Sequence, residues 1–217
     1  RVVLLEPESQ KKLPDSVAAK SVTILQSATP LDPKPTSPRD SFQVAVVGHL
    51  RPIKDPFAAA DASLLLPPSS GIAITHWGAA LTDAMREQAV SLTANNPRYE
   101  WIGELDHEQS RRRLANSDLM VISSLAEGGP AAISEAIVDD VPIIAHQNDA
   151  IIGLLTRDYP GIYHHRSRRQ LAGLMVAAET DARFYAALKH FVKTLRPRFL
   201  PAHESAALKR LLQSIET

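Results

Sequence analysis

Apolar runs and helical patterns alternate along residues 42–146. The runs, such as FQVAVVG at 42–48, are apolar at neighbouring positions, so both faces of each strand are expected to be buried. The segments between them carry apolar residues at helical spacing. This alternation predicts an α/β fold, a Rossmann-like, doubly wound parallel sheet with helices on both faces.

The predicted elements follow one another closely. The predicted strands are residues 42–48, 71–76, 99–102, 119–123 and 142–146. The predicted helices are residues 56–66, 81–93, 107–115 and 130–138, with C-terminal helices at 168–179, 181–195 and 204–215. Ligands bind to such sheets at the carboxyl ends of the strands. We therefore expect functional residues directly after each strand.

The first 40 residues differ in pattern from the rest. Residues 2–5 (VVLL) predict a buried strand, and residues 21–26 (SVTILQ) alternate in polarity and predict a second one. Residues 29–40 contain four prolines, which helix interiors and central strands do not tolerate. We expect residues 1–40 to be the remnant of a preceding domain with a proline-rich linker. Residues 41–217 would form the ligand-binding domain.

Composition excludes several function classes. The 217 residues include no Cys, so disulfides, thiolate nucleophiles and Cys-ligated zinc are excluded. Lys plus Arg and Asp plus Glu are both 24, without the basic excess of a nucleic-acid-binding domain. Arginine clusters at 111–113 and at 166, 168 and 169 are interpreted as solvated helix faces. No apolar run approaches the ~20 residues of a membrane span, no signal peptide is visible, and we expect a cytoplasmic protein.

The strongest motif is SSLAEGGPAAISEAIVDDVPIIA at residues 123–145, which predicts strand, loop, helix, loop and strand. Its glycines let the backbone approach a ligand closely, and its proline suits the first position of a helix. The N–H groups at such a helix start bind phosphate. The candidate phosphate-binding residues are Gly128, Gly129, Pro130, Ala131 and Ala132.

Two glutamates flank this helix start. Glu127 precedes the helix and Glu135 lies about a turn and a half into it. Carboxylates accept hydrogen bonds from sugar hydroxyls, so the spacing suits a phosphate flanked by two polyols. An acidic loop with a solvated helix glutamate fits the spacing equally well.

Basic and glycine residues follow the other strands. Gly48 ends a strand, and His49, Arg51 and Lys54 come after it as candidate phosphate ligands or as plain loop cations. Gly78 follows the next strand and is expected to bring its backbone near the ligand. Beyond the third strand, backbone groups are candidates to meet a nucleobase at Gly103, Glu104 and Leu105.

Together these motifs resemble the C-terminal domain of GT-B glycosyltransferases, particularly the retaining family 4 type. The matching residues, in the family's order, are Gly48, His49, Lys54, Gly78, Gly103, Glu127, Gly128 and Glu135. The resemblance covers residues 42–180. It implies a glycosyltransferase that moves a sugar, with retention, from a nucleotide sugar such as UDP-N-acetylglucosamine to an unknown acceptor.

The resemblance also implies roles for these residues. Lys54, with His49 or Arg51, would stabilise the diphosphate leaving group, together with the N–H groups of residues 128–132. Glu135 would hold the ribose and Glu127 the donor sugar. No metal or other cofactor is implied, since cations and a helix dipole stabilise the departing nucleotide.

The resemblance has consequences for the whole protein as well. The sequence starts at Arg1, directly before a strand, and we interpret it as a fragment whose N-terminal domain is missing, with trimmed disordered residues as the alternative. The acceptor would bind mostly to that domain. The fragment alone would therefore bind the donor and catalyse poorly.

The sequence departs from the family pattern at two positions. His49 replaces the phosphate-binding arginine, and Asp140 replaces a glycine before Val-Pro, which is tolerated if the φ of Asp140 is negative. The stretches from ILQSATP to DYPGIY are also similar to a narrower subgroup that includes the selenosugar synthases of selenoneine biosynthesis. Two alternatives remain: a GT-B nucleotide-sugar epimerase, and a non-catalytic nucleotide-sugar-binding module, which the loss of the arginine favours.

Overall fold

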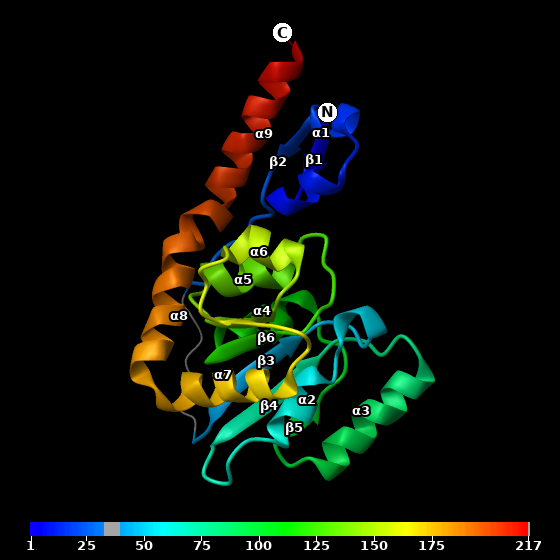
Figure 1. Cartoon of the computed structure of the whole chain (residues 1–217), viewed down its shortest axis with the longest axis vertical. Helices are drawn as coiled ribbons and strands as arrows, with labels where there is room; N and C mark the ends of the chain where they lie inside the picture. The colour runs from blue at the N-terminus through cyan, green and yellow to red at the C-terminus, as the bar shows by residue number, and fades with distance from the viewer. Residues whose placement is uncertain (33–39, 217) are drawn as a thin grey trace.

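The computed structural model describes residues 1–32 and 40–216. Within them, the main sheet has six parallel strands in the order β5-β4-β3-β6-β7-β8. The strands are Phe42–Val47 (β3), Ile72–Trp77 (β4), Tyr99–Trp101 (β5), Leu119–Ile122 (β6), Ile143–His146 (β7) and Ile162–Tyr163 (β8). The strand order reverses between β3 and β6, as in a doubly wound sheet. Figure 1 shows the sheet among its helices.

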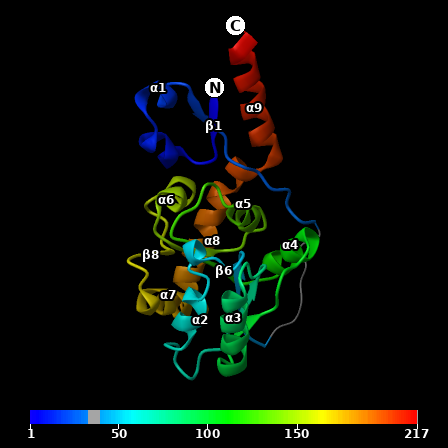
Figure 2. The same ribbon diagram turned by 90° about the vertical axis from the view of Figure 1, so that its right-hand side faces the viewer.

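Helices cover both faces of this sheet. The helices after β3 are Ala58–Ser63 (α2), Asp83–Asn95 (α3), His107–Ala115 (α4), Ala131–Val138 (α5), Asp149–Leu155 (α6), Arg168–Thr180 (α7), Ala182–Leu195 (α8) and Pro201–Glu216 (α9). Helix α9 does not cover the sheet but extends away from it (Figure 1). Helix α2 packs against α7, α4 packs against α5, and the two pairs lie on opposite sides of the sheet (Figure 2). The predicted α/β fold with helices on both faces is confirmed.

The apolar runs form the core as their pattern predicts. Every residue of β6 is buried, and Val44, Ala45 and Val46 of β3 are each at most 5% exposed. The pattern does not predict α6 or β8. Helix α6 has seven residues and β8 has two, which are too few for a period to be visible.

The N-terminal segment forms a separate small sheet. Strand β1 (Val2–Leu4) pairs in parallel with β2 (Ser21–Thr23), and a 3-10 helix, η1 (Pro7–Lys12), and helix α1 (Asp15–Ala18) lie between them. The strand prediction at residues 2–5 is correct, but the predicted burial is wrong, because Val2 is 38% and Val3 43% exposed. A sheet of two strands leaves much of its surface uncovered.

The residues after β2 lie on the main body. Leu25 is buried in its core, and the Ala28 amide donates to the carbonyl of Phe199 at 3.0 Å. Residues 33–39 of the predicted proline-rich linker lie outside the described residues. The division of the chain at residue 40 stays a prediction.

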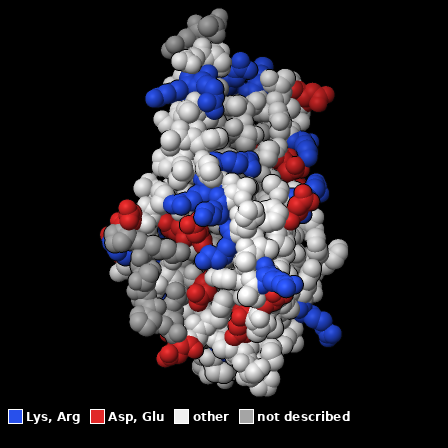
Figure 3. Space-filling view, turned by 90° about the vertical axis from the view of Figure 1, so that its left-hand side faces the viewer, with Lys and Arg blue, Asp and Glu red and all other residues white. Residues whose placement is uncertain are grey.

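Two arginines correct the prediction of solvated helix faces. The side chain of Arg111 is only 7% exposed, and its Nη2 donates to Asp139 at 2.7 Å and to the Thr29 carbonyl at 2.9 Å. Arg168 pairs with two aspartates, Asp55 and Asp61. Each guanidinium thus binds carboxylates of a neighbouring element. On the face shown in Figure 3, basic and acidic side chains lie interspersed.

Asp140 does not meet the condition for replacing the family's glycine, because its φ is +55° rather than negative. It follows α5, where the Asp140 amide donates to the Ile137 carbonyl at 3.2 Å and the Val141 amide to the Ala136 carbonyl at 2.8 Å. These two bonds form a Schellman motif, which requires a left-handed residue at this position. The family's glycine fits that conformation without strain, whereas aspartate adopts it at some cost.

Asp140→Gly is therefore expected to raise the free energy of unfolding by about 1 kcal/mol. Little is lost with the side chain, because its ion pair with Arg196 is long, at 3.6 Å, and partly exposed. Urea denaturation of both proteins measures the difference. Asp140→Ala is the matched control, since it removes the same carboxylate but keeps a Cβ, and it should not stabilise. An Asp140→Gly protein less stable than the wild type would contradict the inference that the left-handed conformation strains Asp140.

Candidate functional site

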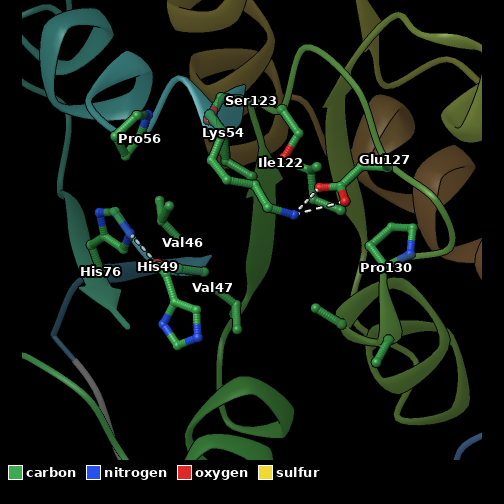
Figure 4. Close-up of a pocket in the computed structure, with 15 residues that line it drawn as sticks. Val46, Val47, His49, Lys54, Pro56, His76, Ile122, Ser123, Glu127 and Pro130 are labelled. Atoms are coloured by element: carbon green, nitrogen blue, oxygen red, sulfur yellow. Dashed lines mark hydrogen bonds and ion pairs between the residues drawn. The ribbon is translucent and has the colours of Figure 1, made fainter. Parts of the chain in front are cut away.

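Two adjoining cavities open at the carboxyl ends of the central strands. The first, of about 190 Å³, lies between the ends of β3 and β6 and the start of α5, and the second, of about 270 Å³, lies towards the end of β5. They share Val47, Gly48, His49 and Lys54 as a common wall. The site therefore lies where the order of strands reverses, as the sequence predicts for a ligand. Figure 4 shows the first cavity.

The ends of β3, β4 and β5 are joined through their glycines. The Gly78 amide donates to the Gly103 carbonyl at 2.8 Å, and the Gly48 amide donates to the Trp77 carbonyl at 3.0 Å. Gly78 has φ +148° and lies so close to Gly48 that a Cβ would be 2.1 Å from the Gly48 oxygen. Gly78 was predicted to bring backbone near a ligand. It does line the second cavity, but its main contact is with the neighbouring strand end.

His49 is held in one tautomer by the backbone. The Ala79 amide donates to Nδ1 of His49 at 3.0 Å. An amide N–H can only donate, so Nδ1 has no proton and the hydrogen of the neutral ring is on Nε2. His49 lines both cavities and thus offers a neutral N–H donor where the family that the motifs resemble has an arginine. Arg51, the suggested substitute, is exposed and lines the second cavity only.

Lys54 and Glu127 form an ion pair across the first cavity. Nζ of Lys54 lies 2.5 Å from Oε1 and 2.7 Å from Oε2 of Glu127, with side chains only 22% and 8% exposed (Figure 4). Two bonds hold their loops together. The Ser123 hydroxyl donates to the Lys54 carbonyl at 2.8 Å, and the Leu125 amide donates to the Ile53 carbonyl at 2.9 Å.

Asp55 anchors the Lys54 loop from the other side, and sequence reasoning missed it. It ends the 3-10 helix η2 (Pro52–Lys54) with φ +44°, and its carboxylate accepts two 2.8 Å hydrogen bonds from Arg168. Burial alone would raise the pKa of Asp55, but the hydrogen bonds from Arg168 and Arg166 outweigh it and lower the pKa below its usual value. The pair ties α7 to the loop that presents Lys54.

The predicted phosphate-binding loop lines the first cavity at Pro130, Ala131 and Ala132. Helix α5 starts at Ala131, so Pro130 is its N-cap, with φ −72°, rather than its first helical residue. The first N–H groups of a helix have no intrahelical acceptor. Gly128 and Gly129 precede this helix start but do not line the cavity, and a Cβ on Gly129 would meet Leu5 at 2.6 Å.

Glu135 lies outside the lining of both cavities. It is buried in α5, with Oε1 3.1 Å from Nε2 of His107 and Oε2 4.0 Å from Nε of Arg111. His107 starts α4, directly after the loop in which Glu104 and Leu105 line the second cavity. The predicted ribose-binding and base-binding residues are therefore neighbours, joined through His107.

His76 is a further residue of the first cavity that sequence reasoning missed. It is 1% exposed, with Nδ1 2.8 Å from the Tyr99 hydroxyl and Nε2 3.0 Å from the Gly48 carbonyl. The carbonyl can only accept, so Nε2 carries the proton and Tyr99 donates to Nδ1. The polar residue within the apolar run GIAITHW was the available signal.

Within the described ranges, 1–32 and 40–216, no group of three or more His, Asp or Glu side chains is placed to hold a metal ion. Among these same residues, no helix combines the length and the apolar character needed to cross a bilayer.

Comparison with known proteins gives matches of fold only. No protein-family model matches the sequence, and no curated protein sequence matches it. Anabaena HepE in complex with UDP-glucose is similar, with a TM-score of 0.82 and 16% identity over 98% of this chain and 63% of that chain. The pneumococcal O-GlcNAc transferase GtfA in complex with UDP and GlcNAc has a TM-score of 0.74 and 16% identity, covering 98% of this chain and 44% of that chain.

Sucrose-phosphate synthase from Thermosynechococcus elongatus is similar too, with a TM-score of 0.78 and 17% identity over 99% of this chain and 58% of that chain. The chain thus spans between 44% and 63% of the length of these three solved structures. At such low identity the likeness concerns the fold. The chain has the Rossmann-like α/β fold of a GT-B glycosyltransferase domain.

Proposed function

We propose that the chain is the donor-binding part of a glycosyltransferase that takes its sugar from a UDP-linked nucleotide sugar. One observation carries the proposal. Lys54, the N–H of His49 and the start of α5 all line one cavity at the point where strand order reverses. Cations and helix N-termini are the groups that bind a diphosphate. Similar folds hold UDP or UDP-glucose.

Each side of the site has a chemical task in this proposal. Lys54, His49 and the amides at the start of α5 bind the diphosphate and stabilise the negative charge that grows on it as the sugar leaves. Arg51 adds a cation at the rim of the second cavity. Residues 103–105 face the base, and Glu135, oriented by His107, holds the ribose. Glu127 binds hydroxyls of the donor sugar.

Titration of UDP and UDP-N-acetylglucosamine by calorimetry tests the proposal. Lys54→Ala should weaken UDP binding by about 30-fold, because a charge-assisted hydrogen bond is worth about 2 kcal/mol. Lys209→Ala is the control, since it removes the same charge from the exposed surface of α9. Absence of UDP binding at millimolar concentration, or equal loss in both variants, would contradict the proposal.

The Glu135→Ala variant tests independently whether Glu135 binds the ribose hydroxyls. UDP binding should weaken by about tenfold as two hydroxyl hydrogen bonds are lost. Inorganic pyrophosphate has no ribose, so its binding should not change. Equal weakening for both ligands would mean that Glu135 acts through the fold and not through the ribose.

Finer assignments are part of the proposal and rest on the resemblance of the sequence motifs. They are retention, membership of family 4, metal independence and a hexosyl donor. For the acceptor, the selenosugar subgroup suggests selenophosphate, and sugar transfer to selenophosphate would test that resemblance. We expect residues 1–217 alone to bind the donor and to transfer little sugar. Release of an epimerised free sugar would favour the epimerase alternative.

A further inference from the structure

The ion pair between Lys54 and Glu127 uses the cation that a diphosphate needs. Both carboxylate oxygens lie within 2.7 Å of the ammonium, in a bidentate contact. Glu127 is 8% exposed, so little solvent screens its charge. The same cavity wall continues into Pro130 and Ala131, where the phosphate-binding helix starts (Figure 4). The carboxylate of Glu127 therefore lies beside Lys54 at a place in the cavity where a phosphate group could otherwise bind.

A diphosphate entering this cavity meets Glu127 as a competitor. Lys54 has three N–H donors, and two short contacts already engage it with the carboxylate. Phosphate oxygens placed beside that carboxylate are repelled by it. Drawing Lys54 away leaves a buried carboxylate without its partner, which is costly. A nucleoside diphosphate without a sugar has to bear both costs.

A donor sugar changes this balance. Its hydroxyl groups can donate to Glu127 and replace the hydrogen bonds that the carboxylate gives up. Lys54 is then released to the diphosphate. We infer, on the basis of the proposed function, that the Lys54–Glu127 pair discriminates between substrate and product. Glu127 favours the sugar-bearing nucleotide and competes with the bare nucleoside diphosphate for Lys54.

Glu127→Gln separates the two effects, because it keeps the size of the side chain and removes its charge. UDP should bind about tenfold more tightly to this variant, since Lys54 and the cavity lose a competing anion. Inorganic pyrophosphate should show the same gain. UDP-N-acetylglucosamine should gain less affinity. The dissociation constant of UDP divided by that of UDP-N-acetylglucosamine should therefore fall. Calorimetry measures all three, and thermal unfolding shows that the variant is folded.

Two further variants sharpen the result. Glu127→Asp keeps the charge and should leave UDP binding without a tenfold gain. Glu87→Gln removes the same charge from the exposed surface of α3, where it lines neither cavity, and should leave the ratio unchanged. UDP binding that is unchanged or weaker in Glu127→Gln overturns the inference alone. Failure of the wild type to bind UDP or its sugar conjugate overturns the proposed function and the inference together.

Discussion

Gly78→Ala is expected to destabilise the fold by about 4 kcal/mol, from backbone strain and overpacking together. The new Cβ would lie 2.1 Å from the oxygen and 2.4 Å from the carbon of Gly48, and both are backbone atoms. The φ of +148° is one that side-chain-bearing residues rarely adopt. Relief requires the ends of β3 and β4 to separate. That movement would also displace the Gly48 carbonyl from His76 and distort the shared wall of the two cavities.

The same substitution at Gly173 is a matched control with the opposite sign. Gly173 lies inside α7, and a Cβ there would have no atom within 4 Å. Alanine should therefore stabilise the helix by about 1 kcal/mol. Chemical denaturation of the two variants and the wild type compares them directly. A Gly78→Ala protein within 1 kcal/mol of the wild type would show that the strand ends relax far more easily than the fixed backbone contact implies.

The sequence predicts the fold well because burial on both faces leaves a local signal. The central strands β3, β6 and β7 are mostly apolar, and each lies where its run predicts. The failures have a common cause. The exposure of β1 depends on what packs against it. The elements α6 and β8 are too short to show a period and form against other elements, α6 against η1 and β8 against β7. Local patterns contain neither kind of information.

The site is predicted in part for the same reason. Strand ends and the helix start are local features, and the structure brings the ends of β3 and β6, with Gly48, and the start of α5 to one cavity. The pairing of Lys54 with Glu127 joins residues 73 positions apart, and no spacing rule predicts it. Arg168 and Asp55 are farther apart still, so nothing local distinguishes this arginine from those of a solvated helix face. Asp140 is a case in which the sequence did contain the information. The family that the motifs resemble has a glycine at this position, and that residue type indicates a left-handed turn.

His76 links the strand ends to the stability of the protein at low pH. Its ring bridges the Tyr99 hydroxyl and the Gly48 carbonyl, at 2.8 and 3.0 Å, in a site with almost no solvent. Burial lowers the pKa of His76 from 6.5 to about 4, although the hydrogen bond to Gly48 opposes this. The folded protein thus keeps the ring neutral over a range in which the unfolded chain takes up a proton.

The expected result is a loss of stability on acidification. The His76 contribution is fully present above pH 6.5 and declines as pH falls towards 4, because only the unfolded state binds the proton there. The decline amounts to about 2 kcal/mol between pH 7 and pH 5, at ~1.4 kcal/mol per unit below the unfolded pKa. Urea denaturation at several pH values measures it for the wild type and for His76→Gln.

His76→Gln separates this histidine from the others. Glutamine does not titrate, so the variant should start less stable at pH 7 and lose about 2 kcal/mol less by pH 5. His146, whose pKa burial also lowers, acts in the same direction in both proteins and cancels in the difference. Parallel stability curves for the two proteins would contradict the prediction. They would mean that the ring accepts a proton without leaving its site, in which case Gly48 and Tyr99 do not hold it neutral.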